Sequence, residues 1–405
     1  MTIAWRARLA LGASILGVAI MGDQAFAQDA AAQEFSAKSG KIQGQMLTPL
    51  SHPWKIAVLP DDRLLITEKT GSLRIYADGK LSDPIANVPK VHFEGQGGLL
   101  SVVAHPGFAT NNTIYLSYAE PAEDQPADAK DPGDPRVGDD GANSDIVLKG
   151  LAVARAVLDG NQLKDVEVIW RQEPKQIGRG HFGGHMAFSG DEKLFITNGD
   201  RQRFLSHDPA TNAGKIVRIN PDGSLPADNM EQGPKNARKD VWSSGHRNPL
   251  GIAFDPATRK LWIHEMGPAG GDELNLIERG ADYGWPAVSN GNHYNGEKIP
   301  NHDTRPEFKK PVITWTPVIS PAGLTFYTDT RFRDWTGKAL IGGLSSEAIV
   351  VVEVKGEEAR ETDRIDMGMR IRDVAQANDG SLYVLKDGED GGLMQLKPLD
   401  KDASR

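Results

Sequence analysis

Six segments of the chain repeat one pattern of apolar and polar positions. Each begins with a small or apolar stretch, passes through a polar turn, and ends in a short apolar stretch rich in β-branched or aromatic residues. The segments begin at Pro53, Gly98, Gly183, Asn248, Pro321 and Ile371. Short apolar stretches bounded by turn residues predict β-strands, and the scarcity of long stretches with helical apolar spacing predicts few helices.

The spacing of the repeats predicts the fold. The second apolar stretches are centred at Leu65, Tyr115, Phe195, Trp262, Leu340 and Tyr383, which lie 50, 80, 67, 78 and 43 residues apart. Strand-rich repeats of roughly 40–50 residues or more are typical of propeller blades. We therefore predict an all-β protein, a six-bladed β-propeller of four-stranded antiparallel blades, over residues 45–400.

Long insertions interrupt the repeats, and in a propeller such loops usually build the functional face. The insertion over residues 119–145 is strongly acidic, with nine Asp or Glu residues against Lys130 and Arg136. Its charge and its prolines predict a solvated, mobile loop between blades. Calcium binding by this loop is an alternative, but no regular spacing of ligands supports it.

The N-terminal residues have the features of an export signal. Two arginines precede a mostly apolar stretch, residues 9–21, and Ala25-Phe26-Ala27 provides a small-x-small cleavage motif. This pattern predicts a signal peptide over residues 1–27 and a protein exported to a bacterial periplasm. Residues 28–44 are mostly small and polar, which predicts a flexible leader before the propeller.

Composition narrows the range of partners. No later segment has the ~18 consecutive apolar residues of a membrane helix, so we expect no membrane span. The net charge of −9 and the lack of a basic patch argue against nucleic acid. The chain has no cysteine, so the fold depends on its core rather than on disulfides, and a haem attached through a C-x-x-C-H motif is excluded.

Two polar residues lie in glycine-rich turns before predicted blades. His181 lies in Gly180-His181-Phe182-Gly183-Gly184, and an exposed histidine has a pKa suited to general-base work near neutral pH. A surface or structural histidine is the alternative. Gln96 precedes the second repeat and offers both a donor and an acceptor to a ligand, although glycine-rich turns are common between blades.

Three further motifs lie beside the strands of later repeats. Arg247 is a permanent cation that can stabilise developing negative charge or form a surface ion pair. Gly267 and Pro268 present two successive carbonyls near carboxylates, which suits Ca²⁺ but also occurs in ordinary turns. Arg370 and Arg372 are two residues apart, so in a strand both project to one side. Such a pair binds a polyanion, typically carboxylates, or forms structural ion pairs with acidic loops.

Taken in order, these motifs resemble those of one enzyme family. The matching segments are GQGGLL at residues 95–100, GHFGG at 180–184, GHRNPLGIAF at 245–254, EMGPAGGDELNLI at 265–277, YGWP at 283–286 and RIRDV at 370–374. Together they resemble the soluble quinoprotein sugar dehydrogenases of the glucose/sorbosone dehydrogenase family, and most closely its aldose sugar dehydrogenase branch. The family's six-bladed propeller agrees with the number of repeats.

The resemblance implies a reaction. The protein would oxidise aldose sugars, or related alcohols or aldehydes, to lactones by hydride transfer to pyrroloquinoline quinone (PQQ). An external quinone or redox protein would then accept the electrons. By the same resemblance, His181 would be the general base, Arg247 would polarise the quinone carbonyl, and Gln96 would line the site.

The resemblance also implies cofactor and metal contacts. Residues contacting the quinone would be Asn248, Gly267, Pro268, Arg370 and Arg372. The backbone carbonyls of Gly267 and Pro268 would hold a Ca²⁺ that bridges to the cofactor, and Glu273 and Tyr283 would bind a second, structural Ca²⁺.

Two positions depart from the family pattern. The family usually has a lysine near the cofactor, and the corresponding residue here is Ser345; losing a cation beside an anionic cofactor should weaken its binding. Gly180 replaces the carboxylate of glucose-preferring members, which disfavours strict glucose specificity. Two alternatives therefore stay open: a Ca²⁺-dependent lactonase or esterase, and a non-catalytic propeller that binds a ligand or partner protein.

Overall fold

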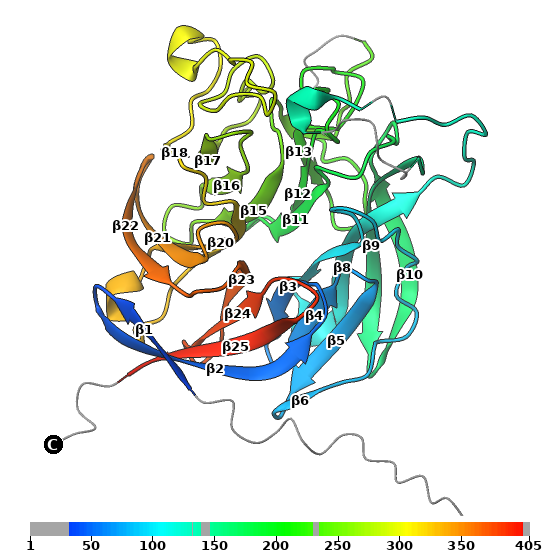
Figure 1. Ribbon diagram of the computed structural model, residues 1–405. Helices are drawn as coiled ribbons and strands as arrows, with labels where there is room; N and C mark the ends of the chain where they lie inside the picture. Colours follow the sequence, from blue (N-terminus) through cyan, green and yellow to red (C-terminus); the bar gives the residue numbers. More distant parts are fainter. Residues whose placement is uncertain (1–31, 132, 139–145, 230–234, 400–405) are drawn as a thin grey trace, which may run out of the picture.

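The computed structural model describes residues 32–131, 133–138, 146–229 and 235–399. Within these ranges the strands form six antiparallel sheets arranged around a central axis (Figure 1). The other elements described are one short helix, α1 (Phe108–Asn111), and the 3-10 turns η1 (Pro135–Val137), η2 (His302–Thr304) and η3 (Arg333–Trp335). The prediction of an all-β, six-bladed propeller with few helices is confirmed.

Blades 1 to 5 are four-stranded sheets whose first strands surround the axis. Blade 1 contains β3 (Pro53–Val58), β4 (Leu64–Glu68), β5 (Ser72–Ala77) and β6 (Lys80–Leu81). Blade 2 contains β7 (Leu99–Ala104), β8 (Thr113–Pro121), β9 (Lys149–Asp159) and β10 (Gln162–Arg171). Blade 3 contains β11 (Gly183–Phe188), β12 (Leu194–Asn198), β13 (Lys215–Ile219) and β14 (Val241–Ser243).

The later blades follow the same order. Blade 4 contains β15 (Pro249–Phe254), β16 (Leu261–Glu265), β17 (Asp272–Ile277) and β18 (Ile313–Trp315). Blade 5 contains β19 (Pro321–Phe326), β20 (Ala339–Gly343), β21 (Ala348–Lys355) and β22 (Glu358–Asp366). Blade 6 begins with β23 (Ile371–Gln376), β24 (Leu382–Lys386) and β25 (Gly391–Pro398). The six predicted strand centres all fall in the second strand of a blade, namely β4, β8, β12, β16, β20 and β24.

The N-terminal strands complete blade 6. β2 (Gly40–Leu50) pairs antiparallel with β25, and β1 (Gln33–Ala37) pairs with β2, so this sheet has five strands. Figure 1 shows the blue strands beside the red one. The prediction of a flexible leader over residues 28–44 is wrong from Gln33 onward. Phe35 and Ile42 are buried in the core while their polar neighbours project outward, and this alternation stabilises both strands.

Apolar side chains fill the spaces between blades. Among the described residues, six buried clusters lie one between each neighbouring pair of blades, so the core is a ring of interfaces rather than one central core. This ring keeps the ends of the strands fixed, and the loops that join them carry the site. The predicted signal peptide, residues 1–27, lies outside the described residues. No helix in the described ranges is long and apolar enough to cross a membrane.

Candidate active site

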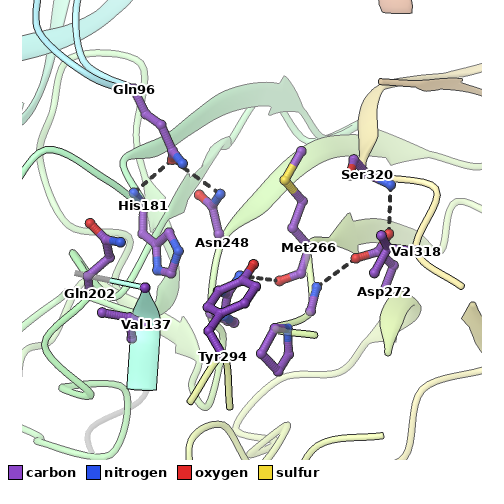
Figure 2. Close-up of a pocket in the computed structure, with 14 residues that line it drawn as sticks. Gln96, Val137, His181, Gln202, Asn248, Met266, Asp272, Tyr294, Val318 and Ser320 are labelled. Carbon is purple, nitrogen blue, oxygen red and sulfur yellow. Dashed lines mark hydrogen bonds between the residues drawn. The ribbon is translucent and has the colours of Figure 1, made fainter. Parts of the chain in front are cut away.

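Loops at one end of the ring surround a cavity of about 310 Å³. Its wall comes from the loops of blades 2 to 5, and Figure 2 shows these side chains converging on it. The lining residues are Gln96, Val137, Gly138, His181, Gln202, Arg247, Asn248, Met266, Gly267, Pro268, Asp272, Tyr294, Val318 and Ser320. The structure therefore gathers six of the predicted site residues: Gln96, His181, Arg247, Asn248, Gly267 and Pro268.

His181 is held in place by a buried carboxylate. Its Nδ1 lies 2.6 Å from Oδ1 of Asp200, whose Oδ2 accepts a hydrogen bond of 2.6 Å from the indole Nε1 of Trp285. Because an ionised carboxylate can only accept hydrogen bonds, the imidazole donates from Nδ1. The proton therefore stays on Nδ1, and Nε2 keeps its lone pair. Burial, and then the charge of Arg247, lower the pKa of His181 to about 4. The imidazole is therefore a neutral acceptor at neutral pH.

The backbone around His181 adopts a conformation that few residues tolerate. His181 has a φ of 50°, in the left-handed region. Gly199, at the end of β12, lies against it, and a Cβ there would be 2.2 Å from the His181 carbonyl oxygen. Only a glycine permits this approach, which brings Asp200 beside the imidazole.

Gln96 connects the loops of three blades. Its Oε1 accepts a hydrogen bond of 2.9 Å from the backbone N–H of His181 and one of 3.4 Å from Nδ2 of Asn248 (Figure 2). Its own backbone N–H donates to the carbonyl of Arg179. Gln96 therefore fixes the base relative to the loop of blade 4, in addition to lining the cavity.

Arg247 and Asn248 lie on a loop fixed by a buried carboxylate. Oε2 of Glu265 accepts a 2.6 Å hydrogen bond from the backbone N–H of Arg247, and Oε1 lies 3.0 Å from Nδ1 of His246. Nη1 of Arg247 donates to the carbonyl of Met266 at 3.0 Å. Both side chains are almost fully buried, at 4% and 1% exposure for Arg247 and Asn248. The guanidinium is thus a rigid charge at the cavity wall.

Two buried polar atoms on this wall lack a hydrogen-bond partner in the described part of the chain. They are Nε of Arg247 and Oδ1 of Asn248. Burying a donor and an acceptor without hydrogen-bond partners costs free energy. These two atoms on one wall therefore indicate a ligand that supplies both partners. A planar cofactor that carries both carbonyl oxygens and a ring N–H, as PQQ does, fits this pair.

The Gly267–Pro268 turn is held from behind by Asp272. Oδ1 of Asp272 accepts a 2.9 Å hydrogen bond from the Gly267 N–H, and Oδ2 accepts from the N–H groups of Ile319 and Ser320 at 2.8 and 2.7 Å. A Cβ at position 267 would be 2.3 Å from the carbonyl oxygen of Gly271, so the turn requires glycine. Fixed carbonyls at a cavity wall are ligands that Ca²⁺ accepts.

The described residues contain no cluster of three or more His, Asp or Glu side chains arranged for a metal. The oxygens that the cavity wall offers to a calcium ion at this turn are the backbone carbonyls of Gly267 and Pro268. Glu273 and Tyr283 do not line the cavity. The Tyr283 carbonyl accepts a 3.1 Å hydrogen bond from Nε2 of His302, whose Nδ1 lies 4.0 Å from Oε1 of Glu273. Burial, and then the carboxylate of Glu265, raise the pKa of Glu273 well above its ordinary value. The second calcium site stays a prediction, at a distance from the cavity.

Arg370 lies just before β23 and Arg372 lies within it, and both side chains reach the same carboxylate of blade 6. Both bind Asp387, with Nε–Oδ distances of 2.9 and 2.8 Å. Neither lines the cavity directly. Nη1 of Arg370 approaches the carbonyl of Leu344 at 3.5 Å, and the Leu344 N–H donates to Ser320 on the cavity wall. The pair therefore lies next to the cavity, and its ion-pair partner comes from the same blade rather than from the acidic insertion.

The acidic insertion contributes to the site, which its composition does not predict. Val137 is buried and lines the cavity beside Tyr294. The backbone carbonyl of Arg136 accepts a 3.1 Å hydrogen bond from the Tyr294 N–H, and its guanidinium lies 4.4 Å from the ring centroid of Phe204. The prediction of a solvated loop is wrong for Val137, which is buried, while Arg136 stays exposed although it contacts two other insertions.

Several wall residues lie outside the motifs that sequence reasoning singled out. These wall residues include Val137, Gln202, Tyr294 and Ser320, and Asp200, which holds His181 from behind the wall, is the most important site residue outside the motifs. One signal could have revealed Asp200. It follows Asn198-Gly199 directly after the second strand of blade 3, and in a propeller the residues after second strands lie at the same end as those before first strands.

The amino-acid sequence matches a family model and the sequence of a known enzyme. A model of the family described as "Glucose / Sorbosone dehydrogenase" matches residues 50–395. The chain is 39% identical over 358 residues to aldose sugar dehydrogenase YliI of Escherichia coli (strain K12), covering 86% of this chain and 91% of that protein.

Solved structures agree with the sequence match. The soluble aldose sugar dehydrogenase of Escherichia coli in its apo-form matches with a TM-score of 0.78 and 37% identity, over 88% of this chain and 100% of that one. The PQQ-bound form of an aldose sugar dehydrogenase from Streptomyces coelicolor matches with a TM-score of 0.66 and 26% identity, over 88% and 98% of the two chains.

Proposed function

The chain belongs to the glucose/sorbosone dehydrogenase family, and from this premise we propose that it is a periplasmic aldose sugar dehydrogenase that uses PQQ and Ca²⁺. One observation supports the chemistry most directly. A buried imidazole, His181, lines a cavity with its Nδ1 bound to Asp200, which leaves Nε2 available to a substrate hydroxyl. The sugar dehydrogenases to which this chain is similar make an aldose the substrate class to test first.

The chain's own residues perform the proton transfer. Nε2 of His181 accepts the proton of the sugar's anomeric hydroxyl, and Asp200 stabilises the imidazolium that forms. The lowered pKa of His181, about 4, keeps the base free of a proton before substrate binds. When bound, the quinone supplies the two-electron acceptor that oxidation of an aldose to a lactone requires.

The cavity wall would hold the cofactor through groups already described. The unpaired Nε of Arg247 and Oδ1 of Asn248 would bind its polar edge, and the carbonyls of Gly267 and Pro268 would hold Ca²⁺ beside it. Arg247 is also positioned to stabilise negative charge that develops on a bound group, because it is buried and fixed by Met266.

Reconstitution tests this proposal. The purified protein is incubated with PQQ and Ca²⁺, and reduction of an artificial electron-accepting dye is followed with a panel of aldoses, with lactone products identified by mass spectrometry. We expect dye reduction that depends on both additions and on the sugar. Failure to bind the quinone together with failure to reduce the dye would contradict the proposal, and a lactone-hydrolysis assay would then test the lactonase alternative.

The base assignment has its own test. His181→Ala should lower kcat by about 10²–10⁴-fold, the usual contribution of a general base, while quinone affinity changes little. Wild-type turnover in this variant would refute the role of His181 without refuting the cofactor.

Export and the electron acceptor are further parts of the proposal. The pattern of residues 1–27 supports cleavage after Ala27. N-terminal sequencing of the protein from a periplasmic fraction should therefore begin at Gln28. The acceptor would be a separate quinone or redox protein, because a cysteine-free chain has no C-x-x-C-H motif to attach a haem.

A further inference from the structure

A half-buried lysine lies beside the two arginines of blade 6. Lys69 follows β4 of blade 1, and its Nζ donates a 2.7 Å hydrogen bond to a neutral carbonyl, that of Gly95, rather than to a carboxylate. Its Nζ lies 5.4 Å from the ring centroid of Trp54, and the guanidinium carbon of Arg372 lies 4.2 Å from a ring centroid of the same residue. Lys69 and Arg372 therefore lie against the same indole, and Arg370 joins them through Asp387. Lys69, Arg370 and Arg372 form one cluster of cations.

This cluster carries more positive charge than its partner can neutralise. Asp387 binds both Arg370 and Arg372, and the charge of Glu94 also acts on Lys69, so three cations face two carboxylates. The charge of Arg372 acts on Lys69, and burial together with this repulsion lowers the pKa of Lys69 to about 8. A partly buried excess of positive charge, with an ammonium that binds only a neutral carbonyl, indicates a site suited to a bound anion.

The position of the cluster links it to the cavity. The cavity wall comes from blades 2 to 5, whereas Lys69 belongs to blade 1 and Arg370 and Arg372 to blade 6. The cluster meets the wall on two sides. Lys69 donates to the carbonyl of Gly95, which precedes the wall residue Gln96. Leu344 lies next to Arg370, and its N–H donates to the carbonyl of the wall residue Ser320. The cations thus occupy the remaining third of the ring, at the same end as the cavity.

We propose that Lys69 is a third cation for the cofactor's carboxylates, acting with Arg370 and Arg372 and supplying the positive charge that the neutral Ser345 does not. This inference rests on the proposed function. Ser345, on the other side of blade 6, is exposed, and its hydroxyl donates to the carbonyl of Val318 at 3.2 Å, so it offers no charge to an anion. An ammonium approaching from blade 1 would add a charge-assisted hydrogen bond to a carboxylate that an arginine already contacts.

Quinone affinity, measured without turnover, tests this inference. PQQ is titrated calorimetrically into the purified protein at saturating Ca²⁺, for the wild type and for Lys69→Met, Lys69→Arg and Lys69→Met combined with Ser345→Lys. Lys260→Met is the control, because Lys260 forms an exposed ion pair with Glu357, away from the cluster. The unfolding midpoint of each variant without ligand shows that the fold is kept.

We expect Lys69→Met to raise the Kd for PQQ about tenfold or more, the usual effect of losing one charged hydrogen bond, and to make Kd less sensitive to added NaCl. Lys69→Arg and the Ser345→Lys double variant should recover most of the affinity, and Lys260→Met should bind as the wild type does. Wild-type affinity in Lys69→Met, or equal losses in the Met and Arg variants, would overturn the inference and leave the proposed function standing. Absence of PQQ binding by the wild type would overturn both.

Discussion

At the scale of single residues, the site depends on buried carboxylates that orient other groups. Asp200 holds His181, Glu265 holds the loop of Arg247, and Asp272 holds the Gly267 turn. Each uses both of its oxygens, and each contacts two segments: Glu265 also accepts a hydrogen bond of 3.1 Å from Nδ2 of Asn275 in β17. The groups facing the cavity are thereby oriented before any ligand arrives, which reduces the entropy lost when substrate binds.

The pH dependence of catalysis reports the environment of His181. Its pKa is lowered to about 4, so the neutral form that accepts a proton is present above about pH 4 and is lost below it. We expect the acidic limb of kcat/KM, which reports the free enzyme, to lie near pH 4 rather than near the ordinary value of about 6.5. The charge of Arg247 contributes to the lowering, so Arg247→Met should move this limb to higher pH. A limb that does not move would contradict the electrostatic account.

Removing the orienting carboxylate should separate catalysis from binding. Asp200→Asn no longer fixes the tautomer of His181 or stabilises its charged form, so kcat should fall about 100-fold or more while PQQ affinity is kept. The matched control is Asp240→Asn. Asp240 is also buried in blade 3 and also accepts from an indole, that of Trp170 at 2.7 Å, but its side chain binds Trp170 and Asn212 rather than His181. Equal loss of kcat in both variants would mean that Asp200 is only structural.

The sequence predicts site residues whose side chains are chemically reactive and lie in recognisable motifs. It does not predict residues that act by holding other residues in place. His181, Arg247 and Gln96 stand out because glycines flank two of them and because a charged or amide side chain in a loop attracts attention. Asp200 and Tyr294 gain their roles from contacts with residues 19 and 158 positions away, His181 and Arg136. Such contacts depend on how blades and insertions meet, which the local pattern does not contain.

At the scale of elements, the insertions form a wall that the blades alone do not provide. Asp131, whose side chain is fully covered, accepts a 2.6 Å hydrogen bond from Nη2 of Arg203, and so ties the insertion of blade 2 to that of blade 3. Tyr294 ties it to the insertion of blade 4. The number of acidic residues predicts that the insertion is exposed, but the covered carboxylate of Asp131 attaches it to the neighbouring insertion. Part of the cavity wall therefore comes from loops whose course the sequence does not give.

Val137 tests the role of this wall. Val137→Ala removes two methyl groups from the cavity lining, so a sugar that packs against them should lose about 1.6 kcal/mol of binding, or about tenfold in KM, with a smaller effect on kcat. The size of the change should differ among aldoses. Val166→Ala, at an exposed position of β10, is the control and should leave the kinetics unchanged. Unchanged KM values across a panel of aldoses would show that the insertion does not contact the substrate.

At the scale of the whole molecule, the ring closes where the ends of the described chain meet. The six repeats predict the blade number, because apolar strands recur at each blade. They do not predict the closure, since β1 and β2 alternate apolar residues with Lys and Gln and therefore lack a continuous apolar run. Blade 6 also joins blade 1 directly: Oδ2 of Asp373 accepts a 2.8 Å hydrogen bond from the Ile56 N–H, and Oδ1 binds Lys55 at 2.9 Å.

The closure predicts that an N-terminal residue far from the cavity controls global stability. Ile42 is 2% exposed and packs in the cluster between blades 5 and 6, so Ile42→Ala should cost about 2–5 kcal/mol and lower Tm by several degrees. Gln43→Ala is the control, because Gln43 is the exposed neighbour of Ile42 in the same strand. This substitution should lower the free energy of unfolding by less than about 0.5 kcal/mol. Thermal unfolding followed by circular dichroism compares the two.

Because every blade packs against two others, opening the ring at blade 6 exposes the interfaces of blades 5 and 1, and the loss should appear as one cooperative transition at lower temperature. Equal Tm values for the two variants would mean that the N-terminal strands are dispensable for the ring.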